Sequence, residues 1–270
     1  MQNKVAIITG ASKGIGRQTA LAFAEAGYET VVVATSGASL LGLKEEIKKL
    51  YNRECLVCCG DLSDMNFVDS IPGLAIERFG RIDVLINNAA WRTIETMRSI
   101  DLATWEKTFR ICITAPAFLA KLCAAAMEQR RINGVIINTS SIMSQQPGGN
   151  SPAYIACKGA LESLTKELAI TYGRSGIRVV GLKPGFIDTE MSNDYKSNLG
   201  DNISEKMAKE LVEKTPLGRP GTANDIARAM VWLASPNAGY ITGCDLTIDG
   251  GLSNNFNSYP IKKLQFPHEY

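Results

Sequence analysis

The sequence predicts an α/β protein in which one parallel sheet is covered by helices on both faces. Short β-branched runs alternate with longer amphipathic segments along the chain, which is the pattern of such a sheet. With 270 residues, 45% of them hydrophobic, the chain is long enough to bury a substantial core. No repeat, linker-like stretch or second domain is recognisable. Seven strands are expected, at Val5–Thr9, Thr30–Ala34, Cys55–Cys59, Ile82–Ile86, Gly134–Ser140, Ile177–Leu182 and Asp245–Ile248.

The first strand runs into a glycine-rich loop, which is followed by an apolar-periodic helix over residues 17–26. The loop has the spacing Gly-x-x-x-Gly-x-Gly at the first strand-to-helix turn. Glycines there let the backbone approach a pyrophosphate, and the helix N-terminus supplies free N–H donors and a partial positive charge. The alternative is a tight turn without a ligand. The residues expected to contact a dinucleotide are Gly10, Ser12, Lys13, Gly14, Ile15 and Gly16.

The end of the second strand predicts which dinucleotide is used. An acid about twenty residues past the loop would hold the ribose hydroxyls of NAD and repel a 2′-phosphate. No acid occurs between Val31 and Lys44, where Thr35 and Ser36 offer hydroxyls instead. Lys13 can add a positive charge. We therefore expect NADP(H), with NAD(H) or dual use as the alternative.

Tyr154 and Lys158 are spaced to act together, because residues four apart on a helix project from one face. The ammonium favours the phenolate form of the tyrosine, so the pair can exchange a proton with a substrate near neutral pH. The same spacing also occurs on many solvated helix faces. Its meaning here depends on the segments that reach the same edge of the sheet.

Polar or glycine-rich segments follow the other predicted strands. Asp61 follows the third strand, two asparagines follow the fourth, and Asp249 follows the last. In an open parallel sheet, ligands bind beyond the carboxyl ends of the strands, so these segments are expected to converge on one crevice. A long apolar helix over residues 102–130 is expected between the fourth and fifth strands.

Several short motifs occur in order along the chain: Thr9-Gly-Ala-Ser-Lys-Gly-Ile-Gly16, Asp61-Leu62, Asn87-Asn-Ala-Ala90, Ser140-Ser141, Tyr154-x-x-x-Lys158, Pro184-Gly185 with Thr189, and Asp249-Gly-Gly251. Together they make the chain resemble the short-chain dehydrogenase/reductase family. Segments 216–221 and 240–243 further resemble the branch of 3-oxoacyl-carrier-protein reductases and of many sugar and ketone reductases. The resemblance implies a single-domain Rossmann fold over residues 1–252, with a doubly wound, seven-stranded parallel sheet.

The resemblance also implies roles for individual residues. Tyr154 would be the general acid in reduction and the general base in oxidation, and Lys158 would hold the nicotinamide ribose. Ser141 would hydrogen-bond the reacting oxygen. The alternative is that its hydroxyl only hydrogen-bonds nearby backbone groups. Asp61 would accept from the adenine amino group. The other implied cofactor contacts, for which a capping or turn role is the alternative, are Leu62, Asn87, Asn88, Ala89, Pro184, Gly185, Ile187 and Thr189.

Three residues depart from the pattern of the family, and one of them, Ala90 in place of the usual glycine, is a minor steric change. The family has an asparagine seven residues after a tryptophan, where it holds a water of the proton relay, but here Trp105 is followed at that distance by Cys112. A thiol is a weak donor and a poor acceptor, so either other groups keep the relay or turnover is slow. Lys183 stands where the family has an apolar residue or an asparagine. It either alters the nicotinamide pocket or faces solvent.

Loops over the crevice are expected to determine the substrate. One of them, at about residues 186–214, resembles the mobile substrate lid of the family. The C-terminal extension, residues 253–270, is longer than the resemblance requires. It is expected to pack over an active site or a neighbouring subunit, with disorder as the alternative. The expected pocket residues are Trp91, Met143, Phe186 and Met191.

Composition and charge restrict the partners. A net charge of +2, with acids and bases interleaved, indicates a small-molecule partner and neither nucleic acid nor a membrane surface. No signal peptide or membrane-spanning run is recognised, and seven scattered cysteines are typical of reduced thiols in the cytoplasm. Cys55-x-x-Cys58-Cys59 lacks a second Cys/His pair, so we expect buried strand cysteines and no metal site. The family resemblance implies a homo-oligomer, either a dimer or a tetramer.

The sequence therefore predicts an NADP(H)-dependent oxidoreductase that interconverts a carbonyl and a secondary alcohol. Two alternatives stay open. One is an NAD-dependent sugar or polyol dehydrogenase, and the other is a cofactor-binding relative with weak or no catalysis because of Cys112. The presence of Ser141, Tyr154 and Lys158 argues against the second. The identity of the substrate cannot be read from the sequence.

Overall fold

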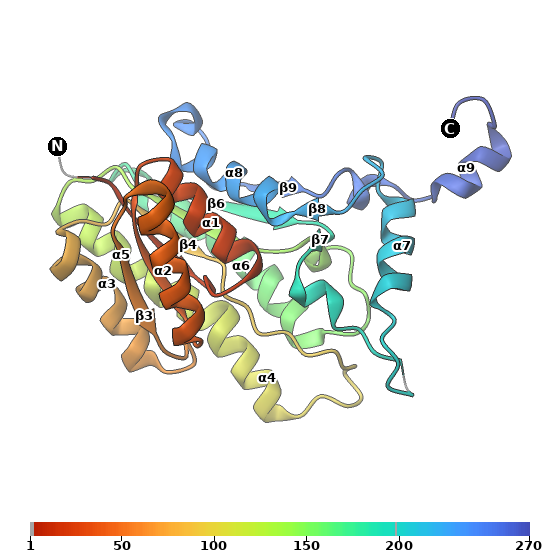
Figure 1. Cartoon of the computed structure of the whole chain (residues 1–270), viewed down its shortest axis with the longest axis horizontal. Coiled ribbons are helices and arrows are strands. Elements are labelled where there is room, and N and C mark those ends of the chain that lie inside the picture. Colours follow the sequence, from red (N-terminus) through yellow and green to blue (C-terminus); the bar gives the residue numbers. More distant parts are fainter. Residues whose placement is uncertain (1–2, 198) are drawn as a thin grey trace.

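The computed structural model describes residues 3–197 and 199–270 and contains the predicted sheet (Figure 1). Its strands are β1 Val5–Thr9, β2 Glu29–Ala34, β3 Cys55–Cys59, β4 Val84–Asn87, β5 Val135–Thr139, β6 Arg178–Pro184 and β9 Asp245–Ile248. All are parallel, in the order β3-β2-β1-β4-β5-β6-β9. The chain winds outward from β1 to β3 and returns to β4 on the other side of β1. Open α/β sheets bind ligands at such a reversal.

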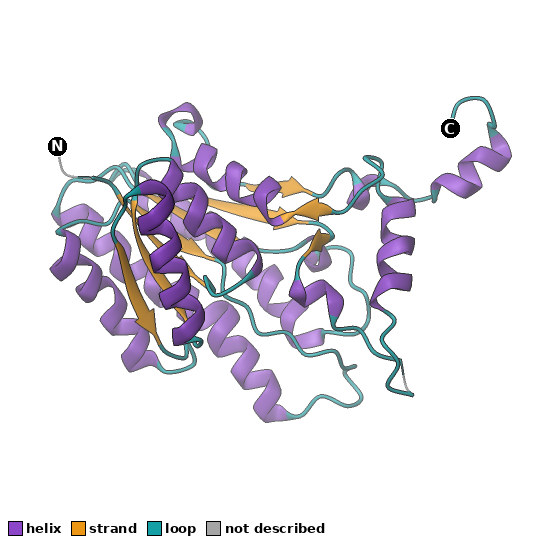
Figure 2. Ribbon diagram, in the orientation of Figure 1, coloured by secondary structure: helices purple, strands orange, loops and turns teal. Residues whose placement is uncertain are grey.

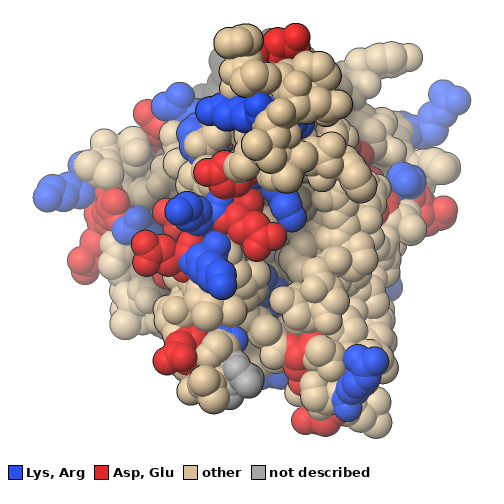
Figure 3. Space-filling model, turned by 90° about the vertical axis from the view of Figure 1, so that its right-hand side faces the viewer, with Lys and Arg blue, Asp and Glu red and all other residues tan. Residues whose placement is uncertain are grey.

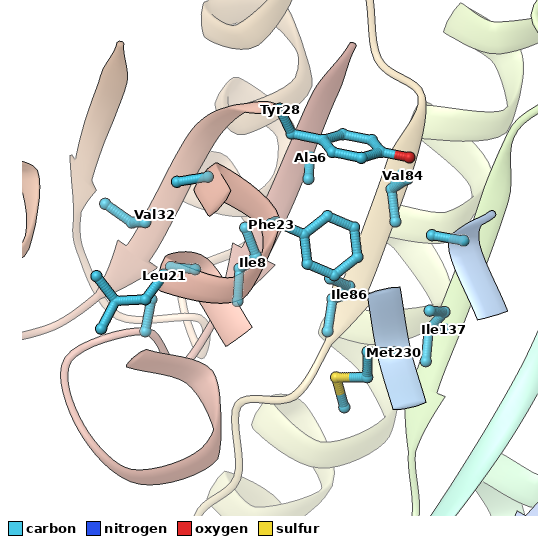
Figure 4. Packing of buried hydrophobic residues seen from close by; sticks show 14 of the residues in the cluster. Ala6, Ile8, Leu21, Phe23, Tyr28, Val32, Val84, Ile86, Ile137 and Met230 are labelled. Carbon is cyan, nitrogen blue, oxygen red and sulfur yellow. The ribbon is translucent and has the colours of Figure 1, made fainter. Parts of the chain in front are cut away.

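Helices cover both faces of the sheet, which is the middle of three layers (Figure 2). They are α1 Gly14–Glu25, α2 Gly37–Tyr51, α3 Met65–Phe79, α5 Ala115–Gln129, α6 Pro152–Gly173 and α8 Ala223–Ala234. One face packs against α1, α2 and α8, and the other packs against α3, α5 and α6. Figure 4 shows the first layer, where Phe23 of α1 and Met230 of α8 lie over Ile8 and Ile86 of the sheet. Burial of both faces explains the nearly continuous apolar runs of the strands.

The predicted helix over residues 102–130 is interrupted near its middle. A π-helical turn, Arg110–Thr114, joins α4 Leu102–Phe109 to α5. Pro116 accounts for the interruption, because it has no N–H to donate to the carbonyl of Cys112 four residues earlier and its ring crowds that carbonyl. The expectation of one long α-helix is therefore corrected at this turn, which is where Cys112 lies.

The stretch Leu102–Gln129 is long and apolar enough, with a mean hydropathy of 1.5, to cross a bilayer by those two criteria. In the fold, half of the most apolar 18-residue segment of this stretch is buried inside the protein. Its C-terminal part, α5, packs against α3 and the sheet. A helix buried in this way belongs to the protein core.

A small substructure stands at the carboxyl end of the sheet. In it, β7 Ile187–Asp188 pairs in parallel with β8 Gly221–Thr222, and between them lie a 3₁₀ turn, Glu190–Asn193, and α7 Ser204–Lys214. Figure 3, viewed from this side, shows basic and acidic side chains intermixed over part of the face. The exposed residues of α7 carry both signs of charge. The outer side of this substructure is therefore solvated.

The C-terminal residues leave the body of the fold and include α9 Tyr259–Gln265 (Figure 1). Asn255 ties this tail to α7, because its Nδ2 donates to the Lys214 carbonyl at 2.6 Å. Phe256 and Leu264 are 97% and 83% exposed. The tail thus presents apolar side chains outward. Further short 3₁₀ turns are Ile142–Ser144, Pro236–Ala238 and Leu252–Asn254.

The cysteines of β3 correct one expectation. Cys55 and Cys58 are buried as predicted, but Cys59 is exposed. Because β3 is the outer strand and Cys59 is its last residue, few groups pack over this side chain.

Candidate active site

The glycine loop forms a cradle at the start of α1. A Cβ added to Gly16 would lie 2.2 Å from the carbonyl oxygen of Gly10, so no side chain fits there. Gly14 has a φ of +53°, in the left-handed region that favours glycine. Lys13 occupies the N-cap position without capping the helix through its side chain, which leaves the first N–H groups of α1 free for an anion. A phosphate fits this backbone and the helix dipole.

The two asparagines after β4 have different roles. Asn88 Nδ2 donates to the Thr9 carbonyl at 3.0 Å, and Thr9 Oγ1 accepts from the N–H groups of Asn88 and Ala89. These bonds hold the glycine loop against the end of β4. The Asn87 side chain turns away, since its Nδ2 donates to Asn138 Oδ1 at 2.9 Å inside the sheet. The expected contact of Asn87 with a cofactor is therefore restricted to its backbone.

The corner expected to hold the 2′-phosphate is polar and open. Thr35 and Ser36 are exposed at the end of β2, and Lys13 is exposed with no ion pair to a described residue. Ser36 also caps α2 by accepting from the Ser39 N–H at 3.4 Å. Its turn role and its predicted binding role are compatible, because a hydroxyl oxygen accepts from one side while its O–H donates to the other.

The turn after β3 holds Asp61 and Leu62. Asp61 Oδ1 accepts from the Ser63 N–H at 2.8 Å, and this hydrogen bond lowers the pKa of the carboxyl. Leu62 is buried. Asp61 therefore remains an ionised acceptor, as contact with an adenine amino group requires.

Lys158 and Tyr154 lie together on the first turns of α6. The Lys158 ammonium is 5.3 Å from the centre of the Tyr154 ring and donates to the Thr139 carbonyl at 2.5 Å. Only 2% of Lys158 is exposed. The predicted pairing of the two side chains on one helix face is thus present, with the ammonium beneath the half-buried tyrosine.

Ser141 follows β5 on the same side of the sheet and is 9% exposed. Its Oγ accepts from the Met143 N–H at 3.1 Å, which caps the 3₁₀ turn Ile142–Ser144. Its O–H has no acceptor among the described residues. Ser141 can therefore donate to an oxygen atom of a bound molecule.

Cys112 fastens the loop after β4 to the π-helical turn. Its Sγ accepts from the Trp91 N–H at 3.3 Å and approaches the Trp91 carbonyl at 3.6 Å. Burial raises the pKa of the Cys112 thiol, although the nearby Lys158 ammonium opposes this. The group therefore stays neutral, and its hydrogen-bonding capacity is used by the backbone of Trp91.

Glu162 is a buried carboxylate that the sequence interpretation missed. It lies one turn after Lys158 and is 8% exposed. Its Oε1 accepts from Ser140 Oγ at 2.7 Å and from Ser144 Oγ. Those serines flank Ser141, so Glu162 ties the turn that carries Ser141 to the helix that carries Lys158. The spacing from Lys158 is visible in the sequence, but no local pattern pairs an acid with serines 22 and 18 positions away.

Lys183 is buried behind this site, which excludes the alternative that it faces solvent. Only 8% of it is exposed. Burial raises the pKa of Asp245, with Glu162 acting in the same direction, while Lys183 and Lys166 oppose them. Asp245 Oδ1 is buried without a hydrogen-bond partner among the described residues. Several charges of both signs therefore lie beneath the serine turn.

Arg92 joins two of the predicted substrate loops. Its Nη1 donates to the Tyr195 hydroxyl at 2.9 Å, and its Nη2 donates to the Met191 carbonyl at 2.8 Å. The Lys107 ammonium lies 4.1 Å from the centre of the Trp91 ring in the same loop. Trp91 and Met191 are each 39% exposed. The loop after β4 thus holds the segment after β6 across the crevice.

The segment after β6 also reaches the glycine loop. A Cβ added to Gly14 would lie 3.4 Å from Thr189 Cγ2, and one added to Gly185 would lie 2.4 Å from Asp249 Cβ. Segments far apart in the sequence therefore meet at the carboxyl edge of the sheet. The other predicted residues here are Pro184 and Ile187, which are buried, and Met143 and Phe186, which are half-buried.

The family model, the related sequences and the solved structures that resemble this chain agree with one another. The chain matches the model described as enoyl-(acyl carrier protein) reductase over residues 10–253. An uncharacterized oxidoreductase of Thermotoga maritima is 35% identical over 94% of this chain and 97% of its own length. Glucose 1-dehydrogenase 2 of Bacillus subtilis is 31% identical over 94% and 96%. L-sorbose reductase from Gluconobacter frateurii, solved with NADPH and L-sorbose, has a TM-score of 0.87, 29% identity, and coverage of 95% and 98%.

These matches span the glycine loop, Ser141, Tyr154 and Lys158. They confirm the predicted family and fold. The relatives are named as oxidoreductases, dehydrogenases or reductases. The chain therefore belongs to the short-chain dehydrogenase/reductase family and is an oxidoreductase that acts on alcohol or carbonyl substrates.

Proposed function

We propose that this protein is an NADP(H)-dependent oxidoreductase that interconverts a carbonyl and a secondary alcohol, with Tyr154 as general acid and base. The proposal rests on the buried Lys158 ammonium, 5.3 Å from the centre of the Tyr154 ring. Burial of a charge is costly unless partners compensate it. Within the described chain, Lys158 hydrogen-bonds only the Thr139 carbonyl. Two of its three N–H donors thus remain for the ribose hydroxyls of a dinucleotide.

The bound dinucleotide would supply the hydride in reduction and accept it in oxidation. In reduction, the Tyr154 hydroxyl donates a proton to the carbonyl oxygen, and in oxidation the phenolate takes the proton from the alcohol. Lys158 stabilises the phenolate by its positive charge. Ser141 donates a hydrogen bond to the same oxygen. Because Glu162 holds the turn that carries Ser141, this donor is positioned before the substrate binds.

The preference for NADP(H) is supported by the corner at the end of β2. Thr35 and Ser36 are exposed there, and no acid occurs between Val31 and Lys44 to repel a 2′-phosphate. The exposed Lys13 ammonium, which has no ion pair to a described residue, can attract that phosphate. The L-sorbose reductase relative was solved with NADPH.

The protein is further proposed to be a cytoplasmic homo-oligomer with a small alcohol or carbonyl substrate. Its net charge of +2 supports a partner other than nucleic acid or a membrane. Phe118 of α5 and Ile170 of α6 are 44% and 78% exposed, which supports helix packing between subunits. Residues of about 186–214 act as the substrate lid. Sugars are the first substrates to test, since relatives are named for glucose and L-sorbose.

Calorimetric titration of the purified protein with NADPH and with NADH tests the cofactor assignment. A panel of sugars, ketones and secondary alcohols is then assayed with the preferred cofactor. Lys13→Ala is expected to raise the KM for NADPH about tenfold or more, and that for NADH much less, because only NADPH carries the 2′-phosphate.

Lys4→Ala is the matched control, since Lys4 is an exposed lysine at the opposite edge of the sheet. It should leave both KM values unchanged. An equal effect of Lys13→Ala on NADPH and NADH would contradict the assignment of the 2′-phosphate site.

A further inference from the structure

A second hollow, the amino-edge pocket, lies where the strands of the sheet begin. It has a volume of about 510 Å³ and is lined by residues that precede or open β1, β2, β4 and β5. The crevice of the candidate active site lies at the other edge. The charged residues that line the amino-edge pocket are Lys4, Arg81, Asp83, Arg130 and Arg131.

The single carboxylate of the amino-edge pocket is already fully engaged. Asp83 accepts from Arg81 Nε at 2.9 Å and Nη2 at 2.6 Å, and also from the Val5 N–H at 2.8 Å. Lys4, Arg130 and Arg131 have no ion pair to a described residue. Three cations therefore line one hollow without a counter-charge from the described chain, and their mutual repulsion favours the binding of an anion.

Arg131 adopts an unusual backbone conformation. Its φ is +52°, and it follows α5 in a turn where the Ile132 N–H donates to the Met127 carbonyl and the Arg131 N–H donates to the Glu128 carbonyl. Glycine is the favoured residue at this position, because a side chain is strained there. The turn therefore carries a charged side chain, at some cost in backbone strain, where it lines the pocket.

Tyr28 adds a hydrogen-bond donor at the wall of the pocket. It is 7% exposed, and its hydroxyl has no hydrogen-bond partner among the described residues. Figure 4 shows this hydroxyl directed toward Val84, which also lines the pocket. Burial raises the pKa of Tyr28, Asp83 acts in the same direction and Arg178 opposes them, so the phenol stays protonated. Because the Tyr28 hydroxyl has no protein acceptor and Tyr28 lines the pocket, its O–H can donate to an anionic oxygen there.

We propose that the amino-edge pocket binds a small anion with at least two negative charges, of the size of pyrophosphate or citrate. Arg130 and Arg131 pair with its oxygens, Tyr28 donates to it, and Lys4 adds a further positive charge. The Arg130 guanidinium keeps its Nη groups for this purpose, because its Nε donates to the Gly80 carbonyl at 2.9 Å. The volume suits a small-molecule site.

Calorimetric titration of the full-length protein with pyrophosphate and with citrate, at constant ionic strength, tests the proposal. Binding should weaken about tenfold or more in Arg131→Gly, which removes a charged partner, and measurably in Tyr28→Phe, which removes one donor. Comparison of the two anions distinguishes a phosphate ligand from a carboxylate ligand. The same titration with the glycine loop occupied by saturating NADPH or NADH controls for anion binding to the backbone of that loop, and should leave the anion affinity unchanged.

Arg131→Gly has a second expected effect that makes the test sharper. Without added anion it should raise the Tm by about 1–4 °C, because glycine relieves the left-handed strain. Asn52→Gly is the matched control, since Asn52 is the other non-glycine residue with a positive φ in the described chain, at 51°, and it caps α2. It should also raise the Tm, but should not change the anion affinity.

Absence of binding at about 10 mM of either anion would overturn the proposal. Binding that survives both Arg131→Gly and Tyr28→Phe, or that disappears when the dinucleotide is bound, would also overturn it by placing the anion elsewhere. If Arg131→Gly does not fold, Arg130→Ala replaces it with the same expected loss of affinity.

Discussion

The two edges of the sheet are made by the same strands but differ in how their polar groups are paired. At the carboxyl edge, Ser140 and Ser144 donate to Glu162, and Lys158 donates to a backbone carbonyl. At the amino edge, Arg130 and Arg131 have no carboxylate partner in the described chain. A paired network holds donors in place, which suits proton transfer to a neutral substrate, whereas unpaired cations suit the binding of an anion.

The edges also differ in how they use left-handed backbone. The carboxyl edge has Gly10 and Gly14 at positive φ, where a phosphate would approach the backbone itself. The amino edge also has glycines at positive φ, Gly27 and Gly80, but there Arg131, which carries a side chain, adopts the same conformation. Left-handed backbone strain at a residue with a side chain is therefore found beside the amino-edge pocket.

The largest effect on catalysis that is confined to the carboxyl edge is expected from Glu162→Ala. Loss of the acceptor for Ser140 and Ser144 loosens the turn that carries Ser141, so kcat should fall about 10- to 100-fold while the Kd for NADPH changes less than about threefold. Glu162→Gln keeps an acceptor oxygen and should retain most of the activity. Steady-state kinetics and calorimetric titration measure the two quantities.

Glu167→Ala is the control for Glu162, because Glu167 is exposed on the same helix. Arg131→Gly is the control from the other edge. Glu167→Ala and Arg131→Gly should each leave kcat unchanged. A fall in kcat with Arg131→Gly would contradict the claim that catalysis depends on the carboxyl edge alone.

A smaller effect, on the free energy of unfolding, is expected from Asp245→Asn. Because burial raises the pKa of Asp245 above its unfolded value, the folded state binds this proton more tightly, and the free energy of unfolding falls as pH rises through that range. The substitution should raise stability at pH 7 by about 0.5–1 kcal/mol, a modest value because the carboxyl is partly exposed.

Urea denaturation from about pH 3 to pH 7 measures the effect of Asp245→Asn. The difference from wild type should shrink below the ordinary pKa of about 3.9, where the aspartate is protonated in both states. A variant that is less stable at pH 7 would mean that the Asp245 carboxylate is stabilised by Lys183.

The parts of the fold that depend on local pattern were predictable. Strand positions, the glycine loop and the Tyr154–Lys158 pair follow from periodicity and spacing along the chain. The interruption of the long helix could have been inferred from Pro116, which removes a helical hydrogen bond.

Contacts between distant segments were not predictable in the same way. The bond from Arg92 to Tyr195 joins residues 103 positions apart, and no local pattern specifies such a pair. The burial of Lys183 depends on which face of β6 packs against α6. The amino-edge pocket joins short segments that each carry only one or two charges.

The most direct test of the central claim is the turnover of Tyr154→Phe with NADPH and an active carbonyl from the substrate panel. The account predicts that kcat falls at least about 100-fold, because the proton donor is lost, while the Kd for NADPH stays within about threefold of the wild-type value. A variant that turns over at nearly the wild-type rate would contradict the assignment of Tyr154 as general acid.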